Sequence, residues 1–301
     1  MIRSTTKFEF RLPLLMIACF GFLCVGSCSK IYSEVQNEDL QIPISASKNI
    51  QDLFSYLEVV EFINSTHSSS GINRKNFDTL EQLINCKLEI IDSLVSDGDG
   101  YRYKVVFPSK TTNFQESMRN YDGKIRFGSF YVDLNFNYRE INALSTITID
   151  SSNACYLRNL NGEVTQIYGD FKFERVFTNK VNLQINNATL EREKIKNIIS
   201  GIFDVSWFAG ENTDGILNDQ IVYSGSGNGV LNNTKYNWKT NLSLEKNFEL
   251  GCGANIIKGI LQVESIDNEK LYKIDFDPFN NKSCDAVVTI NILGKQYEIS
   301  L

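Results

Sequence analysis

The sequence predicts a mainly β protein: an antiparallel meander forming a curved sheet, a sandwich or an open barrel, with one or two N-terminal α-helices. Three observations lead to this prediction. Apolar and polar residues mostly alternate after Cys86, turn-forming pairs interrupt the alternation repeatedly, and helical spacing is confined to the preceding segment. The expected organisation is a helical segment at 47–85 that packs on an antiparallel β domain at 86–301.

The chain begins with a basic stretch that carries Arg3, Lys7 and Arg11 against the single acid Glu9. An uncharged and mostly apolar run, "LLMIACFGFLCVG", follows at 14–26. This order is typical of a signal peptide. Because the run is shorter than the ~20 residues that a helix needs to cross a bilayer, a permanent transmembrane helix is not expected.

Residues 25–28, "VGSC", resemble the lipobox of bacterial lipoproteins. The resemblance implies that the thiol of Cys28 receives a diacylglycerol and that residues 1–27 are then removed. Two acyl chains, such as palmitate, suffice for stable anchoring, so the membrane is the expected partner. An ordinary signal peptide with an incidental cysteine is the alternative. Ser29 favours the outer membrane by analogy with that family, and the choice between the periplasmic and surface leaflets stays open.

Residues 28–46 are polar and mixed, which predicts a lipidated tether. A helix is expected from Lys48 to about Ile63, because apolar residues recur there at helical spacing, with three acidic residues facing solvent. The apolar positions are Ile50, Leu53, Phe54, Leu57 and Val60, and the acidic ones are Asp52, Glu58 and Glu61. A second, short helix is expected at 78–85, where Asp78 and Glu81 resemble a capping box.

Alternation is clearest at 181–185 and 236–244, which predicts half-buried strands. Turns are expected at Asn161-Gly162, the clearest hairpin signal, and at several similar pairs. These are Asp99-Gly100, Asp122-Gly123, Asp214-Gly215, Asn228-Gly229 and Gly294-Lys295. The segment 190–202, "LEREKIKNIISGI", breaks the pattern and fits either a short helix, which we favour, or a charged edge strand.

Without residues 1–27 the chain loses three of its 30 basic residues and one of its 36 acidic ones, which leaves a formal charge of −8. This balance argues against a nucleic-acid partner. Twelve per cent aromatic residues support a packed core. Cys86, Cys155, Cys252 and Cys284 remain besides the anchor, and Cys252 with Cys284 is the preferred disulfide because each borders a predicted neighbouring strand. Two buried thiols are the alternative.

The C-terminal "GCGANIIKGILQV" and "YKIDFDPFNNKSCDAVVTINILGKQYEISL" are similar to the ending of a family of Bacteroidota lipoproteins. The positions that match are Cys252, Gly259, Asp275, Phe276, Cys284, Asp285 and Gly294. "YDGKIRFGSFYVD" resembles a further strand of that family in shortened form, so the resemblance covers roughly residues 86–301. It implies an envelope location and a β-rich body, and the family has no established activity.

The residues bear on several possible chemistries. His67, the only histidine, lies in "STHSSS" without a nucleophile elbow, so a catalytic triad is not expected. Calcium is the best metal candidate, through Asp275, Asp277 and Asp285, although Asx-rich turns explain these residues more simply. A similar acidic cluster spans 211–219. Two short motifs, at 78–80 and 92–94, resemble an O-glycosylation site. No cofactor is expected.

The leading hypothesis is a lipid-anchored, non-enzymatic binding or structural module of the cell envelope, whose protein or glycan partner the sequence does not name. One alternative is a periplasmic carrier, which requires an apolar cavity in an open curved sheet. The other is a surface glycan-processing enzyme, which requires a carboxylate pair in a cleft with exposed aromatics. Burial of both tryptophans, Trp207 and Trp238, would count against this last alternative.

Overall fold

The fold was obtained as a computed structural model that describes residues 38–65, 67–68, 71–72, 84–92, 100–108, 120–135, 137–210, 216–249, 252–253 and 255–301. By its contacts the chain forms two compact units, Met1–Gln41 and Ile42–Leu301. The sheet and nearly all of the described helix belong to the second unit.

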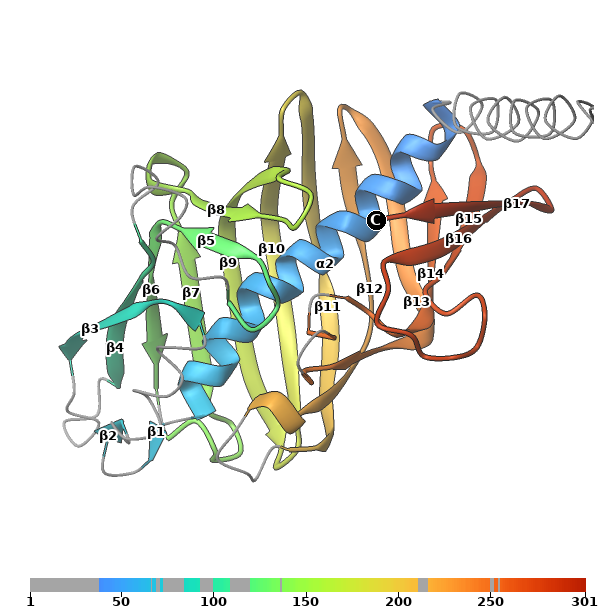
Figure 1. The fold of residues 1–301 in the computed structure, drawn as a ribbon. Helices are drawn as coiled ribbons and strands as arrows, with labels where there is room; N and C mark the ends of the chain where they lie inside the picture. Colours follow the sequence, from blue (N-terminus) through green and yellow to red (C-terminus); the bar gives the residue numbers. More distant parts are fainter. Residues whose placement is uncertain are drawn as a thin grey trace, which may run out of the picture. The chain divides into compact units, whose positions relative to one another are not determined.

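The mainly β, antiparallel fold predicted from the sequence is confirmed. One sheet of 15 strands surrounds the helix α2 (Glu38–Ser65), and it is the single curved sheet among the arrangements left open above (Figure 1). The strands of this sheet are β3 (Lys87–Asp92), β4 (Tyr101–Val106), β5 (Ile125–Phe127), β6 (Ser129–Leu134), β7 (Leu144–Ile149), β8 (Cys155–Arg158), β9 (Val164–Phe177), β10 (Lys180–Arg192), β11 (Ile195–Ala209), β12 (Gln220–Leu231), β13 (Thr234–Asn247), β14 (Lys258–Ser265), β15 (Lys270–Asp275), β16 (Val287–Ile292) and β17 (Lys295–Ser300).

The topology is a meander in which sequence neighbours are mostly sheet neighbours. From β9 to β17 every strand pairs with the next, and the order continues from β9 through β7, β6 and β4 to the edge strand β3. Strand β8 pairs with β9 and with β5, outside this path. Two short strands, β1 (His67–Ser68) and β2 (Gly71–Ile72), form a separate hairpin, and two 3₁₀ turns lie at η2 (Ser151–Asn153) and η3 (Ile216–Asn218).

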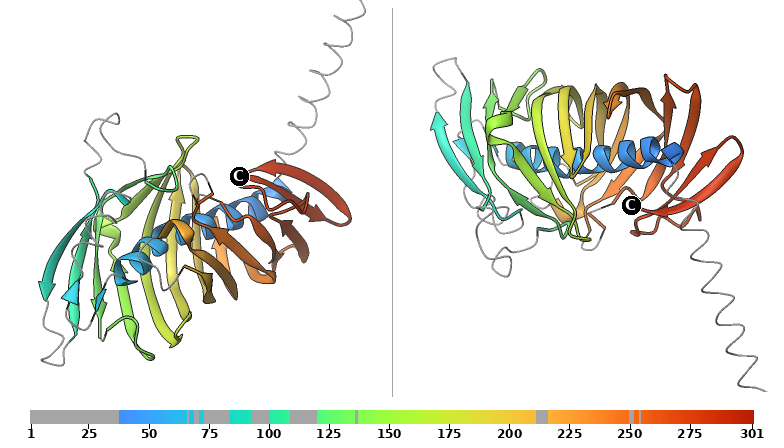
Figure 2. Two further views of the ribbon diagram at one scale, coloured as in Figure 1. Left: turned by 60° about the horizontal axis from the view of Figure 1, so that its bottom comes forward. Right: turned by 90° about the horizontal axis from the view of Figure 1, so that it is seen from above.

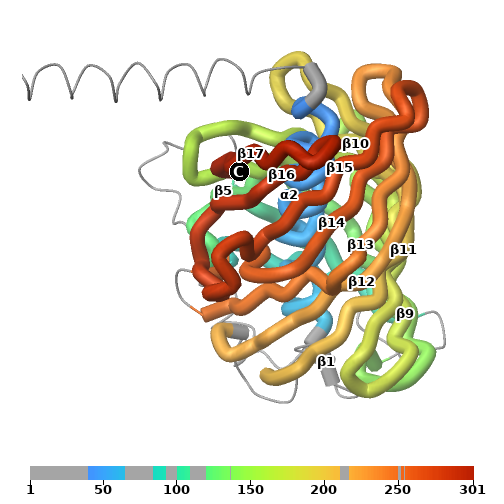
Figure 3. Tube along the Cα trace, turned by 90° about the vertical axis from the view of Figure 1, so that its right-hand side faces the viewer, coloured from blue at the N-terminus to red at the C-terminus, as the bar shows by residue number. Residues whose placement is uncertain are grey.

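Irregularities in the longest strands bend the sheet around the helix. The register shifts between Ile185 and Ala188 where β10 meets β11, and again between Tyr223 and Ser226 where β12 meets β13. A β-bulge increases the local twist and bends the strand that carries it. The sheet consequently curves about α2, as two further views and the side view show (Figures 2 and 3).

Helix α2 begins at Glu38, ten residues before the predicted start at Lys48. Residues 38–46, which the sequence assigned to the tether, are therefore helical, even though Pro43 lies inside the helix. A proline there removes one backbone hydrogen bond and strains the preceding turn. Burial in the sheet offsets this cost, because Ile42, Ala46 and nearly every later residue of the helix are buried.

Aromatic rings form the centre of the core between helix and sheet. Phe54 stacks on Tyr223 with ring centroids 3.9 Å apart and meets Phe203 edge-on at 4.9 Å. Phe203 in turn stacks on Trp238 at 4.6 Å. Trp238 lies across Gly201, where a methyl group would overlap its ring. Because Gly201 has no side chain, it leaves room for the indole ring of Trp238 without interrupting strand β11.

The predicted turns had mixed outcomes. The Asn161-Gly162 hairpin is confirmed, because Arg158 of β8 pairs with Val164 of β9. The Asn228-Gly229 turn is wrong: both residues lie inside β12, where Gly229 makes room for the ring of Tyr236. The chain reverses instead at Asn232-Asn233, where both residues have positive φ (45° and 77°).

The helix favoured for 190–202 is also wrong, since this segment ends β10, turns and begins β11. Both strands are paired on both sides, and Leu190 and Ile199 are buried in the core. Pairing and burial override the helical propensity of its Glu, Arg and Lys residues. The expected helix at 78–85 falls outside the described residues except for its last two positions.

No helix in the described parts of the chain is long and apolar enough to cross a membrane.

Candidate functional site: the buried polar line of helix α2

Six polar residues follow one another at every third position of α2, and all six are buried; we call them the polar line. They are Asn49, Asp52, Ser55, Glu58, Glu61 and Asn64. Three residues advance an α-helix by about 300°, so the line winds around the helix and meets a different part of the sheet at each step. The prediction that the three acidic members face solvent was wrong, because the sheet encloses the helix on the sides that would otherwise be wet.

Asp52 lies among groups that donate to it from the sheet. Its carboxylate accepts hydrogen bonds from Thr165 Oγ1 at 2.7 Å and Asn159 Nδ2 at 3.3 Å, and it forms ion pairs with Arg192 at 3.1 Å and Lys124 at 3.7 Å. Burial by itself raises the pKa of Asp52, but Arg192, Lys124 and the two hydrogen bonds outweigh burial and hold that pKa below its ordinary value.

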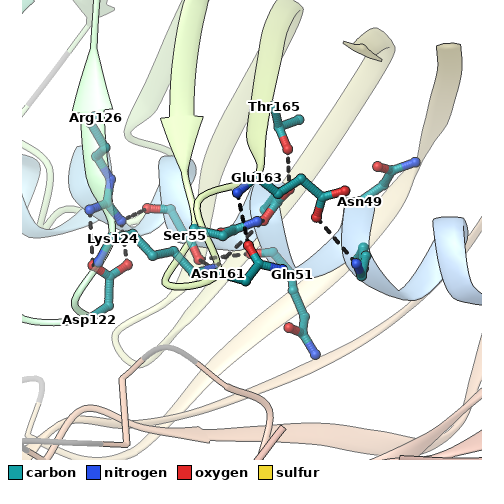
Figure 4. A network of polar contacts seen from close by, with 12 residues as sticks. Asn49, Gln51, Ser55, Asp122, Lys124, Arg126, Asn161, Glu163 and Thr165 are labelled. Atoms are coloured by element: carbon teal, nitrogen blue, oxygen red, sulfur yellow. Dashed lines mark hydrogen bonds and ion pairs between the residues drawn. The ribbon is translucent and has the colours of Figure 1, made fainter. Parts of the chain in front are cut away.

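A second charged group sits beside Ser55 of the helix, where Arg126 and Asp122 form a two-point ion pair. Nη1 and Nη2 of Arg126 donate to the two oxygens of Asp122 at 3.1 and 2.7 Å, and Nη2 also donates to the Ser55 carbonyl oxygen (Figure 4). Lys124 donates to Ser55 Oγ at 2.7 Å. Burial raises the pKa of Asp122, but its bonds to Arg126 and the charge of Lys124 bring that pKa below its ordinary value.

Glu58 is held by two tyrosines and a lysine. It accepts hydrogen bonds from the Tyr223 hydroxyl at 2.7 Å and the Tyr121 hydroxyl at 3.3 Å, and Lys246 Nζ lies 2.8 Å away. Burial, together with the charge of Glu58, raises the pKa of both tyrosines well above the ordinary value. Both hydroxyls therefore stay protonated and donate to the carboxylate throughout the physiological range.

The C-terminal part of the polar line continues the same pattern. Glu61 lies 3.6 Å from Arg175, whose guanidinium also stands 4.5 Å from the centre of the Tyr138 ring. Asn64 accepts a hydrogen bond from the Tyr103 hydroxyl at 2.7 Å and donates to Ser145 Oγ at 3.2 Å.

The two sides of this interface carry opposite charges. The buried lysines and arginines in the described part of the chain all belong to the sheet and its connections: Lys124, Arg126, Arg175, Arg192 and Lys246. The helix supplies the carboxylates Asp52, Glu58 and Glu61, and Asp122 is the strand-side acid that Arg126 binds. Each acid thus meets a cation in a dry environment, where removing one partner costs far more than it would at the surface.

The space around these groups is filled. A cavity of about 10 Å³ lies between the helix and the inner strands, lined by Phe54, Leu57, Glu58 and Glu61 from the helix and by strand residues such as Phe173. This volume admits about one water molecule. The interior that a carrier would offer to an apolar ligand is therefore occupied by α2 itself at this place.

The structure joins Cys252 to Cys284 in a disulfide, the pair that the sequence favoured, with Cα atoms 4.8 Å apart. Cys86 and Cys155 are buried, and burial raises the pKa of the Cys155 thiol to about 12. Cys28, the anchor predicted from the sequence, lies outside the described residues. The disulfide closes the connection after β13 onto the connection after β15.

The three candidate calcium ligands lie in and beside one loop, where their oxygens accept local hydrogen bonds. Asp275 accepts from the Asp277 amide at 3.0 Å, Asp277 from the Asn281 amide at 2.8 Å, and Asp285 from the Val287 amide at 3.0 Å. Among the residues that the structure describes, no group of three or more His, Cys, Asp or Glu side chains is placed to hold a metal ion.

Other predicted positions have separate outcomes. The second acidic cluster lies outside the described residues except at its end, where Asp219 is buried. The backbone at His67 belongs to the β1–β2 hairpin, and its side chain is outside the description, as are the two glycosylation motifs apart from Asp92. Trp207 and Trp238 are both buried, which counts against a glycan-binding platform built on them.

The sequence contained one signal for this site that its amphipathic interpretation missed. A solvent-exposed helical face repeats every three to four residues, whereas this chain places polar residues at six successive positions that are each three residues apart. Such a line cannot stay on one face, so part of it must be buried.

Comparisons of the chain with protein-family models, curated proteins and solved structures found no match.

Proposed function

We propose that the chain is a lipid-anchored protein of the bacterial cell envelope, in the outer membrane, and that its β body is a non-enzymatic binding or structural module. The observation that carries the anchor is the apolar run that ends in "VGSC", with Cys28 as the residue that receives the lipid. Surface exposure and periplasmic exposure are both compatible with this proposal.

The interior supports a non-enzymatic role. The buried carboxylates whose pKa values are lowered, Asp52 and Asp122, are already bound by Arg192 and Arg126. A general acid or base must reach a substrate proton at hydrogen-bond distance. The oxygens of these two carboxylates instead accept hydrogen bonds from residues of the protein itself. The perturbed pKa values are then the product of a structural network rather than of a reaction centre.

The filled interior argues against a carrier, whose ligand would need the volume that α2 occupies. The burial of Trp207 and Trp238 argues against the glycan-processing enzyme, because that hypothesis requires a cleft lined with exposed aromatics. Because the interior is occupied and its charges are paired, the outer face and the loops of the body are the surfaces that a partner can contact. This leaves a protein or glycan partner on the outside as the proposed target.

Metabolic labelling with radioactive palmitate tests the anchor. The wild type should incorporate label and sediment with membranes, and Cys28→Ala should do neither. Cys24→Ala is the matched control, since Cys24 lies in the same apolar run and should leave labelling intact. Equal labelling of wild type and Cys28→Ala would contradict the proposal. Protease treatment of intact and lysed cells then separates the surface leaflet from the periplasmic one.

A further inference from the structure

The two ends of the sheet are built differently. At one end, which we call the turn end, strands β10–β11, β12–β13, β14–β15 and β16–β17 are joined by connections of two to four residues, 193–194, 232–233, 266–269 and 293–294. At the opposite end, the loop end, the connections after β11, β13 and β15 span 210–219, 248–257 and 276–286.

The N-terminal part of α2 lies at the turn end. Asn49 accepts a hydrogen bond from Arg192, the last residue of β10, whereas Asn64 contacts Ser145 near the opposite end of the sheet. Hairpin β16–β17 stands beside this part of the helix in two different views (Figures 1 and 2). The chain therefore enters the β body next to the tip of that hairpin.

Chain length then decides which end the anchor holds near the bilayer. Glu38, where α2 starts, lies ten positions after Cys28, and ten Cα–Cα steps span at most about 35 Å. Strand β11 alone has 15 residues, which is about 50 Å at 3.3 Å per residue. A tether shorter than the sheet keeps the turn end close to the anchor and the loop end away from it.

The tip of hairpin β16–β17 has an unusual residue for a tight turn. Leu293 is 85% exposed, the highest value among the exposed large apolar side chains described, and its φ is +50°. Two-residue turns of this kind favour Asn, Asp or Gly, because a leucine with positive φ is strained. Nothing in the described part of the chain buries this side chain to offset that strain. Ile266, in the neighbouring β14–β15 turn, is also half exposed at 48%.

We propose that the turn end rests on the bilayer and that Leu293 inserts into its surface, an inference that rests on the proposed lipid anchor at Cys28. The occupant is the phospholipid surface itself, because the tether brings this tip to it. These turns carry charges of both signs: Asp267 and Glu269 lie in the β14–β15 turn, Lys270 directly follows it, and Lys295 directly follows the β16–β17 turn. Apolar insertion, and not attraction to anionic lipid, is then the expected force, so the contact should persist on neutral lipid and at high salt.

The test uses the full-length lipidated protein on phosphatidylcholine vesicles with brominated acyl chains, which quench tryptophan in the bilayer. Leu293→Trp adds a reporter at the proposed contact. Phe279→Trp is the matched control at the loop end, where Phe279 is 59% exposed. The native Trp207 and Trp238 are buried and supply a constant background. The added tryptophan at 293 should lose emission on brominated lipid, and the one at 279 should not.

Each other outcome has a defined meaning. Equal quenching at both positions, or none at either, in protein that sediments with the vesicles would overturn this inference and leave the anchor intact. Failure of the lipidated protein to sediment would overturn the proposed function and this inference with it. A concentration-dependent blue shift of Leu293→Trp in the unlipidated Cys28→Ala form would assign the tip to a second copy of the chain, which also overturns it.

Discussion

Two ion pairs of the same chemical kind occupy opposite environments in this protein. Arg126 and Asp122 face each other at 2.7 Å with fully buried side chains, whereas Arg102 and Asp133 face each other at 3.2 Å with side chains 51% and 55% exposed. The exposed pair is screened by water and salt, so its contribution to stability is small. The buried pair cannot lose one member without leaving a charge in a dry core. Burial, and not the number of ion pairs, decides which charges the fold depends on.

The largest expected effect breaks the buried member of this comparison. Arg126→Met leaves Asp122 without its cation and should lower the free energy of unfolding by about 3–5 kcal/mol. Arg102→Met is the matched control and should change it by less than about 1 kcal/mol. Urea denaturation followed by circular dichroism measures both, and similar losses for the two variants would contradict the account.

The next effect concerns the covalent link between two connections at the loop end. Cys252→Ser with Cys284→Ser opens a loop whose ends lie 32 residues apart in sequence, which corresponds to roughly 3–4 kcal/mol in the chain-entropy model. Thermal unfolding of the double variant, compared with the wild type with and without reductant, gives the value. A reductant that shifts the wild type but leaves the double variant unchanged assigns the effect to this bond.

A smaller effect is expected in the apolar part of the core. Gly201→Ala places a methyl group against the ring of Trp238 and 2.6 Å from the Ser226 carbonyl oxygen, and overpacking of this kind costs about 1–3 kcal/mol. The near-ultraviolet circular dichroism of Trp238 should change as well. Gly294→Ala is the control: no atom lies within 4 Å of its added methyl group, so any loss there comes from its φ of +81° and should leave the tryptophan signal unaltered.

The smallest and most gradual effect is the response to acid. Asp52 and Asp122 have folded-state pKa values below the ordinary value of about 3.9, so the unfolded chain takes up protons first as pH falls. Their contribution is complete above about pH 5 and is lost as pH falls through the folded pKa values. Urea denaturation between pH 7 and pH 3 should show this decline, and Asp52→Asn should flatten it. An unaltered slope in that variant would remove Asp52 from the explanation.

The sequence was most informative where a residue pattern acts locally. Alternation predicted the β class, and Asn161-Gly162 predicted a hairpin, because both depend on neighbouring residues and on backbone conformation. The Asn228-Gly229 pair failed because its glycine lies opposite Tyr236 across the β12–β13 hairpin and makes room for that ring. Local chemistry could not reveal that contact.

The burial of the acidic residues of α2 was not predicted, because their partners lie far away in the sequence. Asp52 finds Arg192 across 140 positions of sequence, and Glu58 finds Lys246 across 188. Without those partners in view, an acidic residue on a helix is best assigned to solvent. Pro43 concealed the true start of the helix, since a proline normally ends or precedes one. In both cases long-range packing overrides a rule that holds for an isolated segment.

Native-state hydrogen exchange tests the central claim most directly, namely that an acidic N-terminal helix is locked inside the sheet by buried cations. Amides of α2 from Asn49 to Asn64 should exchange only through global unfolding, as slowly as those of β10 and β11 and far more slowly than those of the edge strand β17. Arg126→Met should accelerate the helix and the central strands together. Exchange of α2 as fast as that of β17, in an otherwise protected protein, would contradict the claim.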